Sequence, residues 1–190
     1  MTLKQLRHHE SFTVPLIQVN ANNSLKIQTD VKLEAWAKSY NIQNYKESAN
    51  DTRIIRLFGV DTIEPDQPFG FEALEYLMTE FNGCDTVNII FWDIDTKSRF
   101  ICEVMRAGET NPEHSINRKL LREGYAITYR KWLIQAGGNL SNEYKADEAY
   151  ARNRHVNFWS LPKNKRYTPK YWRRWRKKVN AEKPMVNSGR

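Results

Sequence analysis

The sequence Arg56-Leu57-Phe58-Gly59-Val60-Asp61-Thr62-Ile63-Glu64 joins a predicted strand to an acidic loop. The strand is expected over residues 52–60, because β-branched and apolar residues dominate that run. The loop, residues 61–69, carries Asp61, Glu64 and Asp66 together with two prolines. Two carboxylates are therefore expected just past the end of a strand, near the guanidinium group of Arg56.

Strands and helices are predicted on both sides of this run. Apolar alternation and β-rich composition predict strands at 11–19, 86–92 and 99–105, an alternating segment at 25–36 and a short extended piece at 125–129. Apolar residues at helical spacing predict helices at 70–81, 115–123 and 141–154, and residues 37–51 read as a polar connection. This order indicates an α+β domain around a small, mostly antiparallel barrel.

A predicted hairpin adds a second set of polar groups, because Asp95 and Arg99 flank its turn. Loop acids and arginines often form only solvated ion pairs, which contribute little to stability. Carboxylates at one rim of a barrel can also bind a hard divalent cation, and two arginines beside them can neutralise a phosphate. The residues by themselves are therefore compatible with a metal-assisted phosphodiester site.

Six segments, in order, resemble the staphylococcal nuclease (thermonuclease) family over roughly residues 12–160. Residues 56–64 resemble its RLxGIDxPE signature, and the other segments are residues 68–73, 83–91, 95–99, 117–126 and 144–160. No single segment is decisive, and their order carries the match. The resemblance implies an OB-type five-stranded β-barrel with three helices, in agreement with the elements expected from the residues.

The resemblance implies a role for each matching side chain. Arg56 and Arg99 correspond to the two arginines that bind the phosphate and stabilise charge in the transition state. Glu64 corresponds to the carboxylate that positions or deprotonates the attacking water. Asp61 corresponds to one ligand of Ca²⁺, and the backbone carbonyl of Thr62 corresponds to another.

The resemblance is looser at other positions. Where the family has a metal-binding aspartate in a DGDT turn, the matching segment reads Ala-Asn-Asn-Ser, and Asn23 takes the place of that aspartate. An amide oxygen can bind Ca²⁺, but the lost negative charge predicts a weakened metal site. If the alignment is shifted, Asp30 takes the place of the family's metal-binding aspartate. Arg130 and Trp132 fall where family members place groups beside the bound nucleotide.

Residues 161–190 form a strongly basic tail. They hold eleven Lys and Arg and one acid, whereas residues 1–160 hold 19 Lys and Arg against 21 acids. Thr168 as N-cap and Pro169 at the first position predict a helix in the tail. The candidate nucleic-acid-binding residues of this helix are Trp172, Arg173, Arg174, Trp175, Arg176, Lys177 and Lys178.

Several roles are compatible with such a tail. It can bind a phosphate backbone while its tryptophans pack on the domain or stack on bases. It can also lie on an anionic membrane surface or dock into an assembly that contains RNA or acidic proteins. A solvated tail whose tryptophans pack on the domain remains the non-functional interpretation.

The amino-acid composition limits the number of domains and the class of protein. The chain has 190 residues, 40% hydrophobic and 27% charged, which is enough for one domain with a core. We expect a flexible N-terminus at 1–11, the nuclease-like domain at 12–160 and the basic tail at 161–190. Cys84 and Cys102 read as reduced thiols, and no secretory signal or membrane span is expected. These features favour an intracellular protein, and the basic N-terminus leaves mitochondrial targeting open.

The leading hypothesis is a Ca²⁺-dependent phosphodiesterase that acts on DNA or RNA and has a weakened metal site. The alternative is a catalytically degraded subunit that binds nucleic acid or serves as a structural component of a larger assembly through its basic tail, with a mitochondrial assembly left open. The geometry of the site discriminates between them. An enzyme requires the four signature side chains around one open pocket, whereas a subunit is expected to have that pocket plugged or closed by internal ion pairs.

Overall fold

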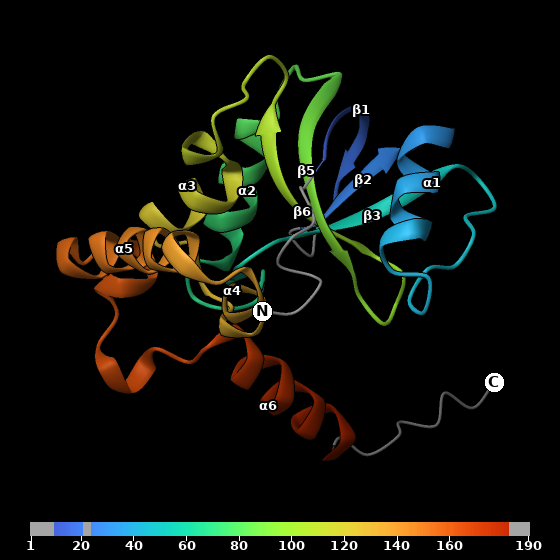
Figure 1. Ribbon diagram of the computed structural model, residues 1–190. Helices are drawn as coiled ribbons and strands as arrows, with labels where there is room; N and C mark the ends of the chain where they lie inside the picture. Colours follow the sequence, from blue (N-terminus) through green and yellow to red (C-terminus); the bar gives the residue numbers. More distant parts are fainter. Residues whose placement is uncertain (1–9, 21–23, 183–190) are drawn as a thin grey trace.

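The computed structural model describes residues 10–20 and 24–182. Five strands close a barrel in the spatial order β1 (Ser11–Val19), β2 (Leu25–Gln28), β3 (Thr52–Leu57), β6 (Phe100–Arg106) and β5 (Thr86–Ile94) (Figure 1). Strand β5 pairs back to β1, and every neighbouring pair is antiparallel except β3 and β6, which are parallel. The expected α+β fold around a five-stranded barrel is confirmed.

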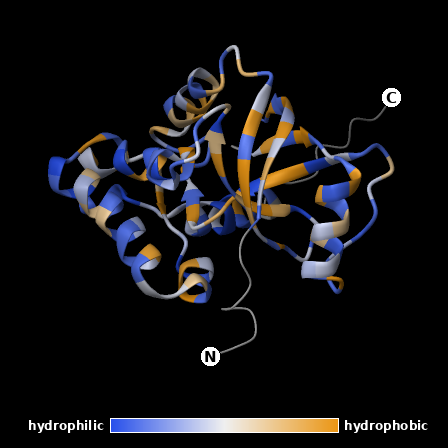
Figure 2. Cartoon of the chain, turned by 45° about the horizontal axis from the view of Figure 1, so that its top comes forward, coloured by the Kyte–Doolittle hydropathy of each residue, from blue (hydrophilic) through white to orange (hydrophobic). Residues whose placement is uncertain are grey.

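The barrel is held together by alternating apolar side chains. Leu25, Ile27, Ile55, Ile89 and Phe91 are fully buried and point inward from three different strands, as the two-residue period of a strand requires. Figure 2 shows hydrophobic residues along the strands, with hydrophilic residues common on the helices. The barrel therefore provides a rigid support for the loops at its rim.

The described residues form six α-helices, whereas three were expected in the domain and one in the tail, so two helices, the first and the fourth along the chain, are additional to the prediction. They are α1 (Val31–Tyr40), α2 (Gly70–Glu80), α3 (Ile116–Arg122), α4 (Arg130–Ala136), α5 (Gly138–Arg154) and α6 (Pro169–Glu182). In Figure 1, α2, α3 and α5 lie on one side of the barrel and α1 lies on the other. Short 3-10 helices occupy Pro112–His114, Asn157–Ser160 and Lys163–Lys165.

Helix α1 shows why the alternating segment at 25–36 was misread. Only the first four residues form a strand, and Asp30 then caps a helix by accepting a hydrogen bond from the Leu33 amide at 2.8 Å. Leu33, Ala37 and Tyr40 are buried at helical spacing. Helix α4 was also missed, since the sequence offers no side-chain cap at its start.

The predicted strand over residues 52–60 is wrong in one respect, because it breaks at Gly59. Strand β3 ends at Leu57, and β4 (Val60–Thr62) instead pairs with β7 (Ala126–Thr128). Gly59 has a φ of +72°, and a Cβ there would lie 2.6 Å from the ring of Tyr144. Only glycine fits this turn without strain, and the turn directs Arg56 and Asp61 toward each other.

The side chain of Asn117, on α3, holds the same turn in place through hydrogen bonds. Its Oδ1 accepts a hydrogen bond from the Val104 amide at 3.0 Å, and its Nδ2 donates to the carbonyl oxygens of Phe58 and Cys102 at 2.9 and 3.1 Å. The side chain is fully buried. A single amide thus joins α3, β6 and the residue that follows β3.

The tail contains the predicted helix, α6. It begins at Pro169, and Thr168 accepts a hydrogen bond from the Tyr171 amide at 3.2 Å, as a capping residue should. In Figure 1, α6 follows the 3-10 helix at 163–165 and extends below α4. Both cysteines are free thiols. No helix within residues 10–20 and 24–182 is long and apolar enough to cross a membrane.

Candidate active site

The four signature side chains converge on one pocket of about 420 Å³. Arg56 lies on β3, Asp61 lies on β4, Glu64 follows β4, and Arg99 directly precedes β6. Thr62 also lines the pocket. The turn at Gly59 brings an Arg56 nitrogen to 4.0 Å from an Asp61 oxygen. Side chains from three separate segments therefore share one cavity at the rim of the barrel.

The two signature arginines of the pocket, Arg56 and Arg99, have different partners. Burial lowers the pKa of Arg56, and the nearby charge of Arg99 lowers it further. Arg99 is held by Asp95, whose Oδ2 accepts from Nε at 2.8 Å, and Asp95 also accepts from the amides of Lys97 and Arg99. Asp95 is thus a structural residue that orders the hairpin turn. Two cations lie side by side here, an arrangement that favours a bound anion.

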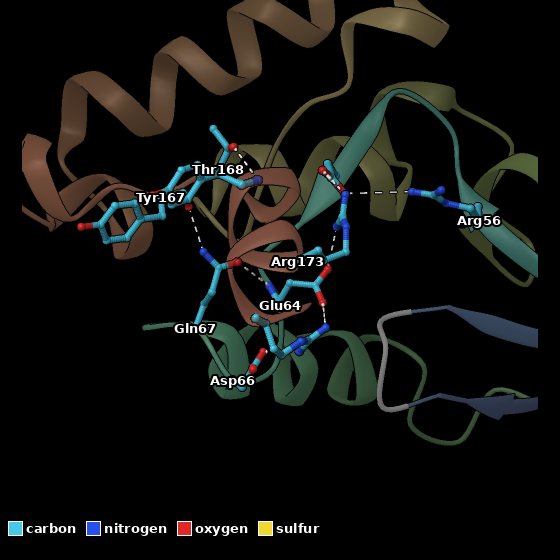
Figure 3. Close-up of polar contacts among 10 residues, drawn as sticks. Arg56, Glu64, Asp66, Gln67, Tyr167, Thr168 and Arg173 are labelled. Carbon is cyan, nitrogen blue, oxygen red and sulfur yellow. Dashed lines mark hydrogen bonds and ion pairs between the residues drawn. The ribbon is translucent and has the colours of Figure 1, made fainter. Parts of the chain in front are cut away.

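The carboxylates are not free, because α6 enters the pocket. Arg173 donates to both oxygens of Asp61, at 3.0 and 2.9 Å, and to Oε1 of Glu64 at 2.6 Å. Arg176 donates to Oε2 of Glu64 at 3.2 Å and to Asp66 at 2.7 Å. Figure 3 shows Arg173 directed at this acidic loop from the α6 ribbon. All four oxygens of Asp61 and Glu64 therefore accept hydrogen bonds from guanidinium groups.

A second link ties the acidic loop to the start of the tail. Gln67 accepts a hydrogen bond from the Glu64 amide at 3.0 Å and donates to the carbonyl oxygen of Tyr167 at 2.8 Å (Figure 3). Gln67 is buried, and so is Pro169 at the start of α6. These contacts place the first turn of α6 against the loop and aim Arg173 at Asp61.

The remaining predicted residues are spread over a wider surface. Trp132 is largely buried and lines an adjoining pocket of about 610 Å³ that Arg56 and Arg99 also line, whereas Arg130 lines neither of these two pockets. Lys177 lines the first pocket. Trp172 is partly buried, and Arg174, Trp175 and Lys178 are exposed. Asn23 lies outside the described residues.

Sequence reasoning missed some functional candidates and misplaced others. Lys97 lines both pockets, and Tyr129 and Lys131 line the second. Arg173 and Arg176 were expected to face a polyanion, yet they bond to the acidic loop. One signal in the sequence could have indicated this contact. The acids at 61 and 64 and the arginines at 173 and 176 have the same three-residue spacing.

The oxygen donors of Asp61, Glu64 and the Thr62 backbone are of the chemical type that Ca²⁺ prefers. Asp61 is only 5% exposed, which limits competition from water. With α6 docked, however, arginine nitrogens already bond to both carboxylates. Among the described residues, no cluster of three or more His, Cys, Asp and Glu side chains could hold a metal ion. While α6 is docked, these carboxylate oxygens are therefore engaged by guanidinium groups.

Comparison with known proteins identifies similar chains. A family model described as staphylococcal nuclease homologue matches residues 54–161. "Endonuclease Htp3" of Saprolegnia parasitica is 35% identical over 133 residues, covering 66% of this chain and 61% of that protein. "Probable endonuclease LCL3" of Candida dubliniensis is 31% identical over 125 residues, 63% of this chain and 52% of that protein. The chain thus spans less than two thirds of the length of these relatives.

Proposed function

Because the chain belongs to the staphylococcal nuclease homologue family, we propose that it hydrolyses phosphodiester bonds of DNA or RNA at the pocket around Arg56, Asp61, Glu64 and Arg99. The observation that carries this proposal is the convergence of two guanidinium groups and two carboxylates on one pocket. Its relatives are named endonuclease and probable endonuclease, and these names support the same reaction class.

Each side chain has a defined task in the proposed reaction. Arg56 and Arg99 bind the non-bridging oxygens of the phosphate and neutralise the charge that grows on them in the transition state. Glu64 accepts a proton from the attacking water, whose oxygen forms a bond to phosphorus. The bond between phosphorus and the leaving sugar oxygen breaks, and that oxygen takes a proton from solvent.

We further propose that the site uses Ca²⁺ and binds it weakly. Asp61, the carbonyl oxygen of Thr62 and the amide of Asn23 would hold the ion. A bound cation would supply positive charge beside the phosphate. Since Asn23 is neutral, one charge fewer attracts the ion than in a site with aspartate.

The test is cleavage of labelled single-stranded DNA and RNA, with Ca²⁺ or with a chelator. The variant Glu64→Gln is expected to lose cleavage by about 10²- to 10⁴-fold, because an amide cannot accept the proton. Glu75→Gln, an exposed acid on α2, is the matched control and should cleave as the wild type does. Asn23→Asp should cleave at lower Ca²⁺ concentrations. Absence of cleavage by the wild type, by Asn23→Asp and by Arg173→Gln, which removes a guanidinium group from the two carboxylates, would refute a hydrolytic site.

The second candidate function is a non-enzymatic subunit that binds nucleic acid or takes part in a larger assembly. The ion pairs that α6 makes with Asp61 and Glu64 favour it, since they close the pocket from within. Cleavage that is absent in the wild type and appears in Asn23→Asp would identify such a degraded nuclease.

We also propose that the exposed face of α6 binds nucleic acid. Tyr171 stacks on Tyr167 at 5.3 Å between ring centroids, and exposed Trp175 lies beside the cations Arg174 and Lys178. Exposed aromatic rings interleaved with cations are typical of single-strand binding surfaces. Charge-removing substitutions at Arg174 and Lys178 should weaken binding of single strands and reduce its salt dependence, whereas a preference for anionic vesicles would favour membrane attachment.

A further inference from the structure

We propose that α6 is an inhibitory segment of this chain, in which the guanidinium group of Arg173 takes the place of the metal ion on Asp61. Docking of α6 and binding of Ca²⁺ are then mutually exclusive. The inference rests on the proposed function only in naming the cation, because the competition concerns the carboxylate oxygens themselves.

The first argument is that Arg173 already occupies both carboxylate oxygens of Asp61. Its two terminal nitrogens lie 2.6–3.0 Å from both oxygens of Asp61 and from Oε1 of Glu64. Ca²⁺ needs to approach the same oxygens to about 2.3–2.6 Å. Two cationic groups cannot bond to one set of oxygens at these distances, so Ca²⁺ can bind Asp61 only after Arg173 has left.

The second argument concerns charge. Burial lowers the pKa of Arg173, but hydrogen bonds to Asp61 and Glu64 outweigh burial and raise it above its usual value. Arg173 is therefore a permanent cation that matches the negative charge of the carboxylates. Their charge is already neutralised while α6 is docked, and the electrostatic attraction for a second cation falls accordingly.

The third argument is that the contact between α6 and the acidic loop is weak enough to be reversible. The side chains of Arg173 and Arg176 remain 34% and 39% exposed, so water and salt screen their ion pairs. The chain before α6 is anchored separately, because Arg166 donates to the carbonyl oxygens of Trp159 and Leu161 at 2.7 Å. Release of α6 therefore breaks the hydrogen bond between Gln67 and Tyr167 and exposes Pro169, while Arg166 keeps the preceding chain on the domain.

The fourth argument concerns the substrate. Arg173, Arg176 and Lys177 line the same pocket as Arg56 and Arg99. In the docked state Glu64 accepts from two guanidinium groups, which leaves neither oxygen free to receive a proton from water. The docked state is therefore inactive, and release of α6 restores both the cation site and the base.

The test is calorimetric titration of the full chain with Ca²⁺ alone. Arg173→Gln is expected to bind Ca²⁺ at least tenfold more tightly than the wild type, because the competing cation is gone. Lys170→Gln removes one exposed charge from the same helix and should bind as the wild type does. Equal affinities of the wild type and Arg173→Gln, or weaker binding by the variant, would overturn the proposal.

A second measurement needs no substitution and covers the case in which Arg173→Gln does not fold. By linkage, Ca²⁺ that displaces α6 must increase amide hydrogen exchange over residues 169–180 of the wild type. Unchanged exchange at saturating Ca²⁺ would also overturn the proposal. Tighter Ca²⁺ binding by Arg173→Gln without any cleavage would support the inhibitory segment and refute the nuclease. If the wild type cleaves and Arg173→Gln cleaves no faster, the nuclease is supported and the inhibitory segment is refuted.

Discussion

Replacing Asn117 with alanine should destabilise the fold strongly and disturb the site, although its side-chain hydrogen bonds go to Val104, Phe58 and Cys102 and not to the four signature side chains. The amide makes three buried hydrogen bonds of 2.9–3.1 Å, to Phe58, Cys102 and Val104. Phe58 lies between Arg56 and Asp61 in the chain. Loss of the amide therefore loosens the turn that brings those two residues together.

The expected cost follows from these bonds. Each buried hydrogen bond contributes about 1 kcal/mol net, and a polar group left buried without a partner costs about 1–3 kcal/mol. In the variant, the carbonyl oxygen of Cys102 still has a hydrogen-bond partner, because it also accepts from the Phe58 amide at 2.7 Å. We expect Asn117→Ala to lower the free energy of unfolding by about 3–5 kcal/mol. For a chain of this size, that corresponds to a drop of roughly 10 °C in Tm.

The assay is urea unfolding followed by circular dichroism, with cleavage measured where the variant is folded. Asn88→Ala is the matched control, because the hydrogen bond from Thr13 to Asn88 is exposed and its bond to Glu109 is only partly buried. The control should lose about 1 kcal/mol or less, since water can replace exposed bonds. A loss below about 1 kcal/mol for Asn117→Ala, or one equal to that of the control, would refute the role assigned to this amide.

Two further substitutions test the buried charges. Burial raises the pKa of Glu103 above 4.5, although hydrogen bonds such as that from Tyr144 partly oppose this. The folded state therefore holds the proton of Glu103 more firmly than the unfolded state does. Because of this difference, the free energy of unfolding falls as pH rises through the folded pKa. Glu103→Gln should accordingly raise the urea midpoint at pH 7.5 and lose this advantage near pH 4, and a lowered midpoint at pH 7.5 would contradict the assignment. Asp147→Asn breaks a buried pair with Arg118 at 2.6 Å and should cost about 3 kcal/mol, whereas Glu143→Gln, whose side chain is 44% exposed, should cost under about 1 kcal/mol by calorimetry.

Much of the fold could be predicted because its signals are local. The helix of the tail was placed correctly from a threonine and a proline at its start. The helices at 31–40 and 130–136 were missed for equally local reasons. The first follows a short strand without a break in apolar alternation, and the second has no side-chain cap. The break at Gly59 was missed because Leu57 and Val60 are both good strand residues, and the break depends on contact with Tyr144.

The sequence by itself determined the order of the motifs, the identity of the four signature side chains and the position of the basic helix. These depend on short-range periodicity, on turn residues and on resemblance. Only the tertiary structure decided where that helix goes. Arg173 meets Asp61 from 112 residues away, and no local pattern specifies the direction in which α6 packs. That direction depends on Gln67, Pro169 and the fold of the acidic loop together, so a segment expected to face a polyanion instead neutralises the protein's own carboxylates.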